Sequence, residues 1–388
     1  MPDPFSPFAI GRLKLRNRFV RSATWDGTAD ESGFVTERSV AIYRKLAASG
    51  IGLIITSYAF VSENGKATHR QYGAHSNDML PGLRRIVEAV HSTDAKVALQ
   101  IVHSGLHSFY LGPQGIVALA PSRVRISKRP HRRMTRAEIE NVIADFAVAA
   151  VRAREVGFDA VQLHGAHGYL MSQFISPLYN HRRDKWGGSP ENRRRFHLEV
   201  IRRVREAVGA DYPIFMKLGV VDDEDGGLSL DEGIEAAYDM VMAGVEALEI
   251  SAGCTARGRP FPTAKTPSDV EDVYYRPQTA AVKRKVSVPV MMVGGIRSLE
   301  QVESILTAGD ADLISMCRPF IREPDLILRW ERGDTAPAKC ISCNKCVVTL
   351  RRGEPLECGE ERRLQEEKYQ GPIAPMNQEG SSSQSAYN

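Results

Sequence analysis

The stretch TRAEIENVIADFAVAAVRAREVGFDAVQLH, residues 135–164, contains one helix, one turn and one strand in succession. Residues 135–155 space their apolar side chains as an amphipathic helix does, and Glu138 stands three residues after the first Thr, as in a capping box. Gly157 suits the left-handed position that ends a helix, and residues 159–164 then read as a short strand. This order predicts a fold in which helices and strands alternate.

The same order of elements repeats along the chain. Strand-like runs, most of them apolar throughout, as in a parallel sheet covered on both faces, alternate with amphipathic stretches. Eight β/α units favour a (β/α)8 TIM barrel over an open doubly wound sheet, which usually has fewer strands and a glycine-rich first turn. We expect strands at residues 18–23, 52–57, 96–102, 159–164, 213–218, 247–251, 288–293 and 312–316, and helices at 80–91, 135–155, 190–207, 230–243, 276–285 and 298–308.

Composition and charge limit the class of protein. The chain has 388 residues, of which 43% are hydrophobic and 25% charged, as in soluble globular proteins. The net charge of +4 is spread over the chain and does not suggest nucleic-acid binding. No apolar run reaches about 18 residues, and the N-terminus lacks the basic and apolar regions of a signal peptide. We therefore expect a cytoplasmic protein without nucleic-acid or membrane partners.

Three parts of the chain differ in pattern. Residues 1–335 carry the barrel, and residues 104–134 form a long insertion after the third strand that we expect to act as a lid. Residues 336–361 form a short Cys-rich extension. Residues 362–388 are polar and contain a Ser-rich run, so we expect a disordered tail there.

The motif His164-Gly165-Ala166-His167-Gly168-Tyr169 directly follows the fourth strand. In a TIM barrel the chemistry takes place at this end of the strands. Two imidazoles three residues apart can converge on one oxygen if the backbone turns, and the neighbouring glycines allow a tight turn. The nearby phenol adds a weak acid, so the motif suggests an oxyanion clamp with a proton donor. A His-x-x-His metal site and simple packing histidines remain the alternatives.

At this motif the sequence resembles the old yellow enzyme family, flavin-dependent ene-reductases on a TIM barrel that binds FMN. The resemblance covers roughly residues 5–360. It is carried by residues 162–170, Ser176-Pro177, residues 180–184, residues 186–193, residues 15–20 and residues 317–324.

This resemblance implies which residues bind FMN across the barrel mouth. Gln100 would hydrogen-bond the pyrimidine edge, and Lys217 would lie near N1 and O2, where a fixed positive charge stabilises the reduced flavin. The residues implied to line the flavin are Ser22, Ala23, Thr24, Trp25 and Tyr58, and those implied to hold its phosphate are Gly294, Gly295, Cys317 and Arg318.

The resemblance also implies the reaction. Hydride from NAD(P)H would pass through flavin N5 to the β-carbon of an α,β-unsaturated carbonyl compound. His164 and His167 would bind the carbonyl oxygen, and Tyr169 would protonate the α-carbon. Two positions depart from the family pattern: Trp25, after Thr24, stands where Thr or Cys is frequent, and Lys217 replaces an Arg.

Four of the six cysteines are clustered near the C-terminus: Cys340, Cys343, Cys346 and Cys358. Their spacing suits tetrahedral zinc or an iron–sulfur cluster. The run of residues 340–346 resembles the 2,4-dienoyl-CoA reductase and trimethylamine dehydrogenase branch of the family, whose cysteines hold [4Fe-4S]. A cluster, a zinc ion and an unoccupied remnant all remain open.

Three functions are compatible with the sequence. The first is an NAD(P)H-dependent ene-reductase acting on a small molecule. The second is a Schiff-base lyase with Lys217 as nucleophile. The third is an FMN and iron–sulfur component for electron transfer or dehydrogenation, with a separate redox partner. The first is favoured because several strand-end motifs match one flavoprotein family; a homo-oligomer is left open.

Overall fold

The computed structural model describes residues 2–222, 224–254 and 273–369. Within these ranges eight parallel strands form a closed barrel, because β14 pairs with β3 and every other strand pairs with its neighbours. The predicted TIM barrel is confirmed, with strand ends shifted by at most two residues. The strands are β3 (Phe19–Arg21), β4 (Leu53–Ile55), β7 (Lys96–Val102), β10 (Ala160–Gly165), β11 (Ile214–Gly219), β12 (Ala247–Ser251), β13 (Val290–Val293) and β14 (Leu313–Met316).

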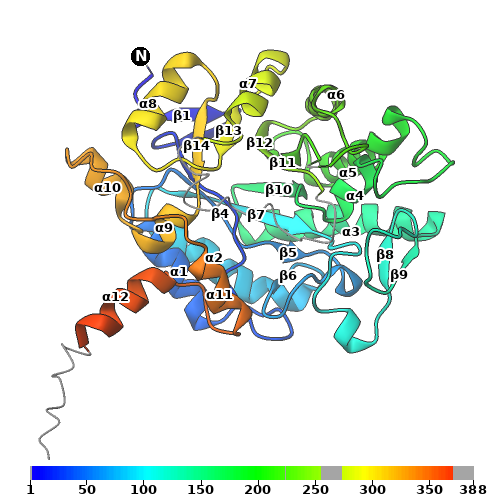
Figure 1. The fold of residues 1–388 in the computed structure, drawn as a ribbon, viewed down its shortest axis with the longest axis horizontal. Helices are drawn as coiled ribbons and strands as arrows, with labels where there is room; N and C mark the ends of the chain where they lie inside the picture. Colours follow the sequence, from blue (N-terminus) through cyan, green and yellow to red (C-terminus); the bar gives the residue numbers. More distant parts are fainter. Residues whose placement is uncertain (1, 223, 255–272, 370–388) are drawn as a thin grey trace, which may run out of the picture.

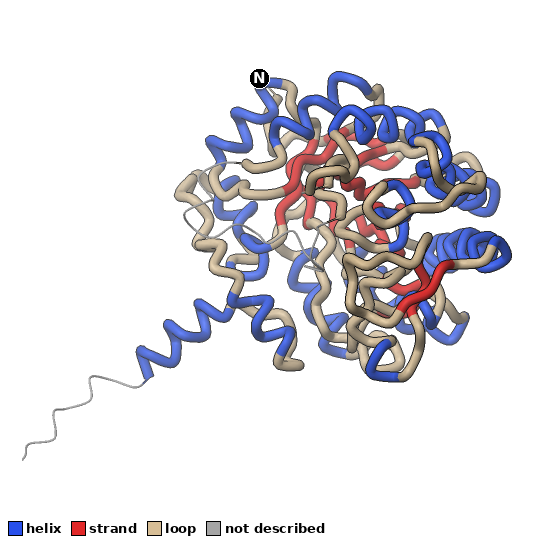
Figure 2. The backbone as a smooth tube through the Cα atoms, turned by 45° about the vertical axis from the view of Figure 1, so that its right-hand side comes forward, coloured by secondary structure: helices blue, strands red, loops and turns tan. Residues whose placement is uncertain are grey.

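Helices surround the barrel, and Figure 2 shows the strands at the centre with the helices outside them. Thr135 accepts a hydrogen bond from the Glu138 amide at the start of α3, and Gly157 ends this helix at φ 98°. The capping-box prediction is therefore confirmed. The outer helices are α1 (Glu37–Ala47), α2 (Leu80–His91), α3 (Arg136–Val156), α5 (Pro190–Val208), α6 (Leu230–Met242), α7 (Arg276–Lys285), α8 (Leu299–Ala308), α9 (Arg318–Arg322) and α10 (Leu326–Glu331).

The N-terminal end of the barrel is closed by an antiparallel hairpin. Strands β1 (Phe8–Ile10) and β2 (Leu13–Leu15) pair across a turn at Gly11, where φ is +54°. Apolar side chains of the hairpin, such as Ile10, pack against residues inside the barrel, such as Phe215. The hairpin thus covers the N-terminal end, while the predicted site residues lie at the opposite mouth.

Short elements between the strands build up the mouth. The segment after β4 contains β5 (Ala59–Phe60), η1 (Glu63–Gly65), β6 (Tyr72–Gly73) and η2 (Asn77–Met79). The insertion of residues 104–134 contains η3 (Gly112–Gln114), β8 (Ala118–Ala120) and β9 (His131–Arg133), and the two strands pair in parallel. Leu106, Ala120 and Val124 of the insertion pack against Tyr179 and Cys254, which anchors it beside the mouth.

The C-terminal extension packs against the outside of the barrel. It contains α11 (Lys345–Arg351) and α12 (Gly359–Tyr369), and α12 projects away from the body (Figure 1). Residues 362–369, which the sequence placed in a disordered tail, are therefore helical. Ion pairs one turn apart, such as Arg362 with Glu366 at 3.2 Å, support this exposed helix. Residues 370–388 of the predicted tail lie outside the described residues.

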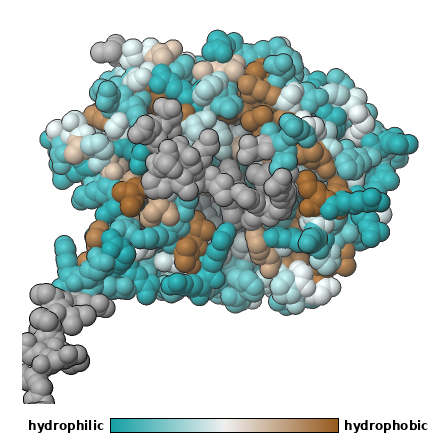
Figure 3. Space-filling view, in the orientation of Figure 1, coloured by the Kyte–Doolittle hydropathy of each residue, from teal (hydrophilic) through white to brown (hydrophobic). Residues whose placement is uncertain are grey.

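The face in Figure 3 is mostly hydrophilic, and its hydrophobic residues form separate patches. Exposed apolar side chains stand on different elements, for example Met242 at the end of α6 and Phe109 in the insertion. No helix in the described part of the chain is both long and apolar enough to cross a membrane.

Candidate active site at the C-terminal mouth of the barrel

The end of β10 and the turn after it bring three rings together. His164 is the last side chain of the strand, and positive φ angles at His167 (61°) and Gly168 (74°) turn the chain back sharply. The ring centroids of His164 and His167 lie 5.1 Å apart, and those of His164 and Tyr169 4.9 Å apart. The sequence prediction that these residues converge is consistent with this geometry.

Hydrogen bonds fix the orientation of the rings. The amide of Ala166 donates to His164 Nδ1 at 3.3 Å, so neutral His164 carries its proton on Nε2. Nε2 of His167 lies 2.7 Å from Ser251 Oγ at the end of β12. The Tyr169 hydroxyl makes a longer contact of 3.4 Å with the Tyr58 hydroxyl. His164 can therefore donate a proton in a hydrogen bond to a substrate oxygen.

Burial sets the protonation states of this group. It lowers the pKa of His164 well below its ordinary value and that of His167 to about 3, and the Lys217 charge adds to both effects. Burial also raises the pKa of Tyr169 well above 10. At neutral pH the site thus holds two neutral imidazoles and a protonated phenol, which can stabilise an oxyanion and supply a proton.

The described residues offer the histidine pair no further metal ligands. Among the described residues, no group of three or more His, Cys, Asp or Glu side chains is arranged to hold a metal ion. The His-x-x-His alternative therefore has no support in the part of the chain that the structure describes.

A buried polar network joins the ends of four strands at the centre of the mouth. Lys217 Nζ on β11 lies 3.0 Å from Glu249 Oε1 on β12 and donates to Ser22 Oγ at 2.8 Å. The Ser22 hydroxyl, just after β3, donates to Glu249 at 2.6 Å, and Ser315 on β14 does so at 2.7 Å. The sequence interpretation missed Glu249, although a single carboxylate inside the apolar run Ala247–Ser251 was a signal for it.

The network extends to the predicted pyrimidine-binding Gln100. Its side-chain amide donates to Gln162 Oε1 at 2.7 Å, and the Gln162 amide donates to Glu249 Oε2 at 2.9 Å. Gln162 lies in the quoted β10 motif but was given no role. The structure therefore brings Ser22, Gln100 and Lys217 together through two residues, Gln162 and Glu249, to which the sequence interpretation gave no role.

The predicted flavin residues that follow β3 have different surroundings. Trp25 packs against the cluster of Tyr58, Ala67, Val102 and Tyr169. Thr24 Oγ1 instead lies 2.6 Å from Cys317 Sγ. Ala23, between Ser22 and Thr24, packs against the interior of the barrel. The Nε1 atom of Trp25 and the Oγ atom of Ser57 are buried without a hydrogen-bond partner among the described residues. Trp25 rather than Thr24 thus adjoins the His–Tyr group.

The predicted phosphate residues lie at two neighbouring strand ends. Gly294 and Gly295 follow β13 with φ angles of 106° and 84°, and Cys317 and Arg318 follow β14. The ring of Tyr274 lies against Gly294, since a Cβ there would be 2.5 Å from Tyr274 Cε2.

Arg318 points away from the other predicted phosphate residues and toward the C-terminal extension. Its Nη1 donates to Asn344 Oδ1 at 3.0 Å. The structure therefore gathers the four predicted phosphate residues but directs the guanidinium to the Cys-rich segment.

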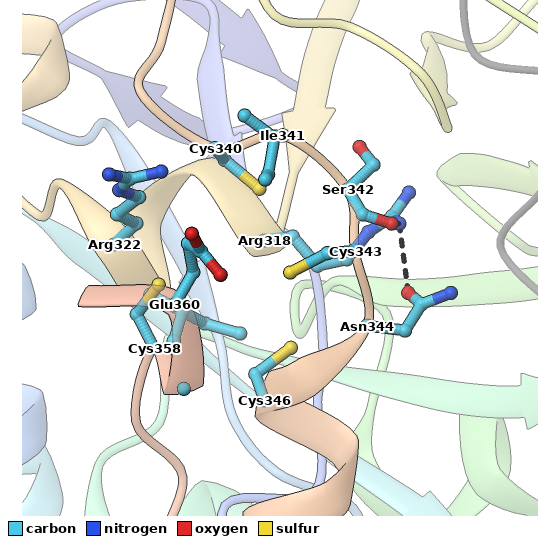
Figure 4. A pocket seen from close by; sticks show the side chains of 12 residues that line it. Arg318, Arg322, Cys340, Ile341, Ser342, Cys343, Asn344, Cys346, Cys358 and Glu360 are labelled. Atoms are coloured by element: carbon cyan, nitrogen blue, oxygen red, sulfur yellow. Dashed lines mark hydrogen bonds between the residues drawn. The ribbon is translucent and has the colours of Figure 1, made fainter. Parts of the chain in front are cut away.

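The four clustered cysteines line one pocket beside this guanidinium, and Figure 4 shows Cys340, Cys343, Cys346 and Cys358 around it. They are nevertheless not arranged to hold a metal ion, since the described residues contain no group of three or more His, Cys, Asp or Glu side chains that could do so. The extension is tied to the barrel by the Leu356 amide, which donates to the Asp26 carbonyl at 3.0 Å. The pocket thus lies close to the strand ends predicted to hold FMN.

Comparisons with known proteins agree with this architecture. The model of the NADH:flavin oxidoreductase / NADH oxidase family matches residues 3–336. An NADH oxidase of Thermoanaerobacter brockii is 39% identical over 88% of this chain and 53% of its own length. An NADPH dehydrogenase of a Geobacillus strain is 35% identical over 82% of this chain and 91% of its own length.

Solved structures show the same relationship. A 2-naphthoyl-CoA reductase superposes with a TM-score of 0.83 at 28% identity, covering 92% of this chain and 56% of that structure. Morphinone reductase in complex with tetrahydroNAD superposes with a TM-score of 0.72 at 26% identity, covering 86% of this chain and 92% of that one.

The chain spans about half the length of several curated relatives that it matches, among them the NADH oxidase. The resemblance of its cysteine motif to the 2,4-dienoyl-CoA reductase branch stays a prediction. With a family model matched over most of its length, the chain belongs to the NADH:flavin oxidoreductase / NADH oxidase family, and the predicted kinship with the old yellow enzymes is confirmed.

Proposed function

We propose that this protein reduces the activated C=C bond of an α,β-unsaturated carbonyl compound with electrons from NAD(P)H. The observation that carries the proposal is the group of His164, His167 and Tyr169 at the barrel mouth. The rings of His167 and Tyr169 each stand nearly perpendicular to that of His164, so that two neutral imidazoles and a protonated phenol face the same space. Reduction of an enone moves negative charge onto its oxygen, so donors aimed there stabilise the transition state more than the ground state.

Membership of the family implies FMN, and the residues at the mouth fit it. Lys217 offers a buried cation at a strand end, and Trp25 Nε1 and Ser57 Oγ are polar atoms that lack a partner among the described residues. Gly294 and Gly295 let backbone amides approach a phosphate closely. When bound, FMN supplies the hydride that passes from NAD(P)H to the substrate.

The side chains of this chain then have separate tasks. His164 and His167 bind the substrate oxygen and orient the C=C bond, and the phenol of Tyr169 delivers a proton to the α-carbon. The apolar faces of Trp25 and Tyr58 flank Tyr169 and exclude water from the proton donor. Ser22, Gln100 and Lys217 hold the pyrimidine end of the cofactor.

A Schiff-base lyase receives less support from the structure. A lysine that attacks a carbonyl must present a free amine. Lys217 is instead engaged by the Glu249 carboxylate at 3.0 Å and by Ser22 at 2.8 Å. Borohydride trapping of a carbonyl substrate on Lys217 would reinstate the lyase.

The cysteine pocket is proposed as the place where a metal centre forms in this chain. Four thiols are donors that suit [4Fe-4S] or zinc, but their present arrangement is not that of a metal site, so no step of the reaction is assigned to it. About four iron atoms and acid-labile sulfide per chain would identify a cluster, one zinc a structural site, and neither metal a remnant.

The experiment that tests the proposed function uses the anaerobically purified protein. A flavin spectrum, bleaching by NADH or NADPH and formation of a saturated ketone from an enone are the expected results. A protein that holds FMN and accepts electrons but does not reduce enones would instead be an electron-transfer or dehydrogenase component. The cytoplasmic location, a homo-oligomeric state and a redox partner stay predictions.

A further inference from the structure

Glu249 is the centre of the network at the barrel mouth. Its side chain is completely buried, and one carboxylate receives Lys217 at 3.0 Å, Ser22 at 2.6 Å, Ser315 at 2.7 Å and the Gln162 amide at 2.9 Å. An uncompensated buried carboxylate is strongly destabilising, so these four partners are what allow a charge to be held here.

The carboxylate is ionised in the folded protein. Burial acts to raise its pKa, but the Lys217 charge and the hydrogen bonds from Ser22, Ser315 and Gln162 together hold the pKa of Glu249 below its ordinary value. A neutral Gln could accept the same two serine hydrogen bonds, because an amide oxygen has two lone pairs. The hydrogen bonds to Ser22 and Ser315 therefore do not by themselves require the charge.

The charge acts on Lys217. Two opposite charges 3.0 Å apart largely cancel at longer distance, so the pair presents a smaller positive potential to the mouth than a lone ammonium would. His164 and His167 are the titratable groups that face the pair, and both are neutral at working pH since their pKa values are strongly lowered. Within the described residues, Glu249 is thus the counter-charge of Lys217.

We propose that Glu249 is a positioning residue that holds Lys217 and offsets its charge, thereby lowering the stabilisation that Lys217 gives to negative charge on the pyrimidine end of the flavin. This inference rests on the proposed function, because it requires that FMN binds at the mouth. Glu249 thereby sets how strongly the Lys217 charge stabilises the reduced flavin.

The test is a titration of FMN-loaded protein with sulfite, whose binding to oxidised flavin places negative charge at the pyrimidine end. Glu249→Gln should bind sulfite about tenfold more tightly than wild type, the order expected for removing one nearby unit charge. The same factor applied to the two-electron reduction of FMN is a rise of about 30 mV in midpoint potential. Ser315→Ala, which removes one hydrogen bond but keeps the carboxylate, should stay within about twofold of wild type.

A pair of further variants keeps the test decisive if Glu249→Gln does not fold. Lys217→Met should weaken sulfite binding at least tenfold. The double variant Lys217→Met/Glu249→Gln has no buried charge and should return to within about threefold of wild type, since the two charges offset each other.

The outcomes separate the two claims. Unchanged or weaker sulfite binding in a folded, FMN-loaded Glu249→Gln protein would overturn the role of Glu249, as would a double variant as weak as Lys217→Met. In both cases the wild type still binds FMN and the proposed function stands. A wild type that binds no FMN would instead contradict the proposed function itself.

Discussion

The ring of Tyr169 stands perpendicular to that of His164, with the centroids 4.9 Å apart and the planes at 86°. This relationship places a phenolic proton beside the imidazole that can bind a substrate oxygen. In an enone the α-carbon is bonded directly to the carbonyl carbon, so an oxygen held by His164 and His167 brings the α-carbon near Tyr169. Binding of the substrate oxygen and protonation of the α-carbon therefore both depend on one turn of the chain, at His167 and Gly168.

Tyr169→Phe should leave reduction of the flavin by NAD(P)H unchanged and slow its reoxidation by an enone. Loss of a general acid costs roughly 10²–10⁴-fold in rate. Stopped-flow measurement of each half-reaction separates the two effects. Tyr179→Phe is a matched control, since this buried phenol lies in the same segment between β10 and α5 and contacts His107 rather than His164. Equal enone rates in wild type and Tyr169→Phe would remove Tyr169 from the mechanism.

His164→Ala and His167→Ala should each weaken the binding of phenolates, which mimic the developing enolate oxygen. A lost donor costs about 2–4 kcal/mol of transition-state stabilisation, and enone reduction should slow accordingly. Titration of a phenol through its charge-transfer band with the flavin measures the affinity. Unchanged phenolate affinity in both variants would leave the two histidines with a packing role.

The barrel and the His–Tyr turn were predictable from the sequence because both have local signatures. Buried parallel strands are apolar throughout, and Gly157 and Gly309 end their helices in the left-handed conformation that glycine favours. Helix α1 was not among the helices named from the sequence, and its N-terminal box pairs Thr36 with Ser39 instead of with Glu or Gln. A pattern search for the usual residues does not find such a cap.

The polar network at the mouth could not be predicted in the same way. Glu249 meets Ser22 and Lys217 from strands far apart in the sequence, and only closure of the barrel sets these distances. The contact of Arg318 with Asn344 likewise joins the last strand end to the extension. Family resemblance supplied the names of the flavin residues, but it did not supply their partners in this chain.

Arg318→Ala should weaken the binding of FMN more than that of riboflavin, which lacks the phosphate. A charge-assisted hydrogen bond contributes about 1.5–3 kcal/mol, so FMN affinity should fall roughly 10- to 100-fold. Fluorescence titration of the apoprotein with both flavins measures the difference. Arg322→Ala, on the same helix, is a suitable control because Arg322 donates to the Lys339 carbonyl. Equal losses for both flavins would mean that Arg318 acts through the extension and not on the phosphate.

His197 should make folding stability depend on pH. It is completely buried, neither ring nitrogen has a hydrogen-bond partner among the described residues, and burial lowers its pKa from 6.5 to about 3. Between pH 6.5 and about pH 3 this histidine is protonated in the unfolded chain and neutral in the folded chain. The free energy of unfolding therefore falls as the pH drops below 6.5.

The variant His197→Leu removes this proton linkage. Relative to wild type it should gain about 1.4 kcal/mol in free energy of unfolding when the pH is lowered from about 7.5 to about 5.5. Urea denaturation at both pH values gives the comparison, with replacement of the exposed His69 by Asn as a control. Parallel pH dependences in wild type and His197→Leu would show that His197 is already protonated or hydrated in the folded state.

The central claim is that the mouth of this barrel reduces enones through the His–Tyr group, and a single-turnover experiment tests it most directly. FMN-loaded protein is reduced anaerobically with a stoichiometric amount of NADPH or NADH and mixed with 2-cyclohexenone. The prediction is enone-dependent return of the oxidised flavin spectrum with formation of cyclohexanone, and much slower return in Tyr169→Phe. A wild-type flavin that stays reduced in the presence of the enone, yet is oxidised on admission of oxygen, would contradict the claim.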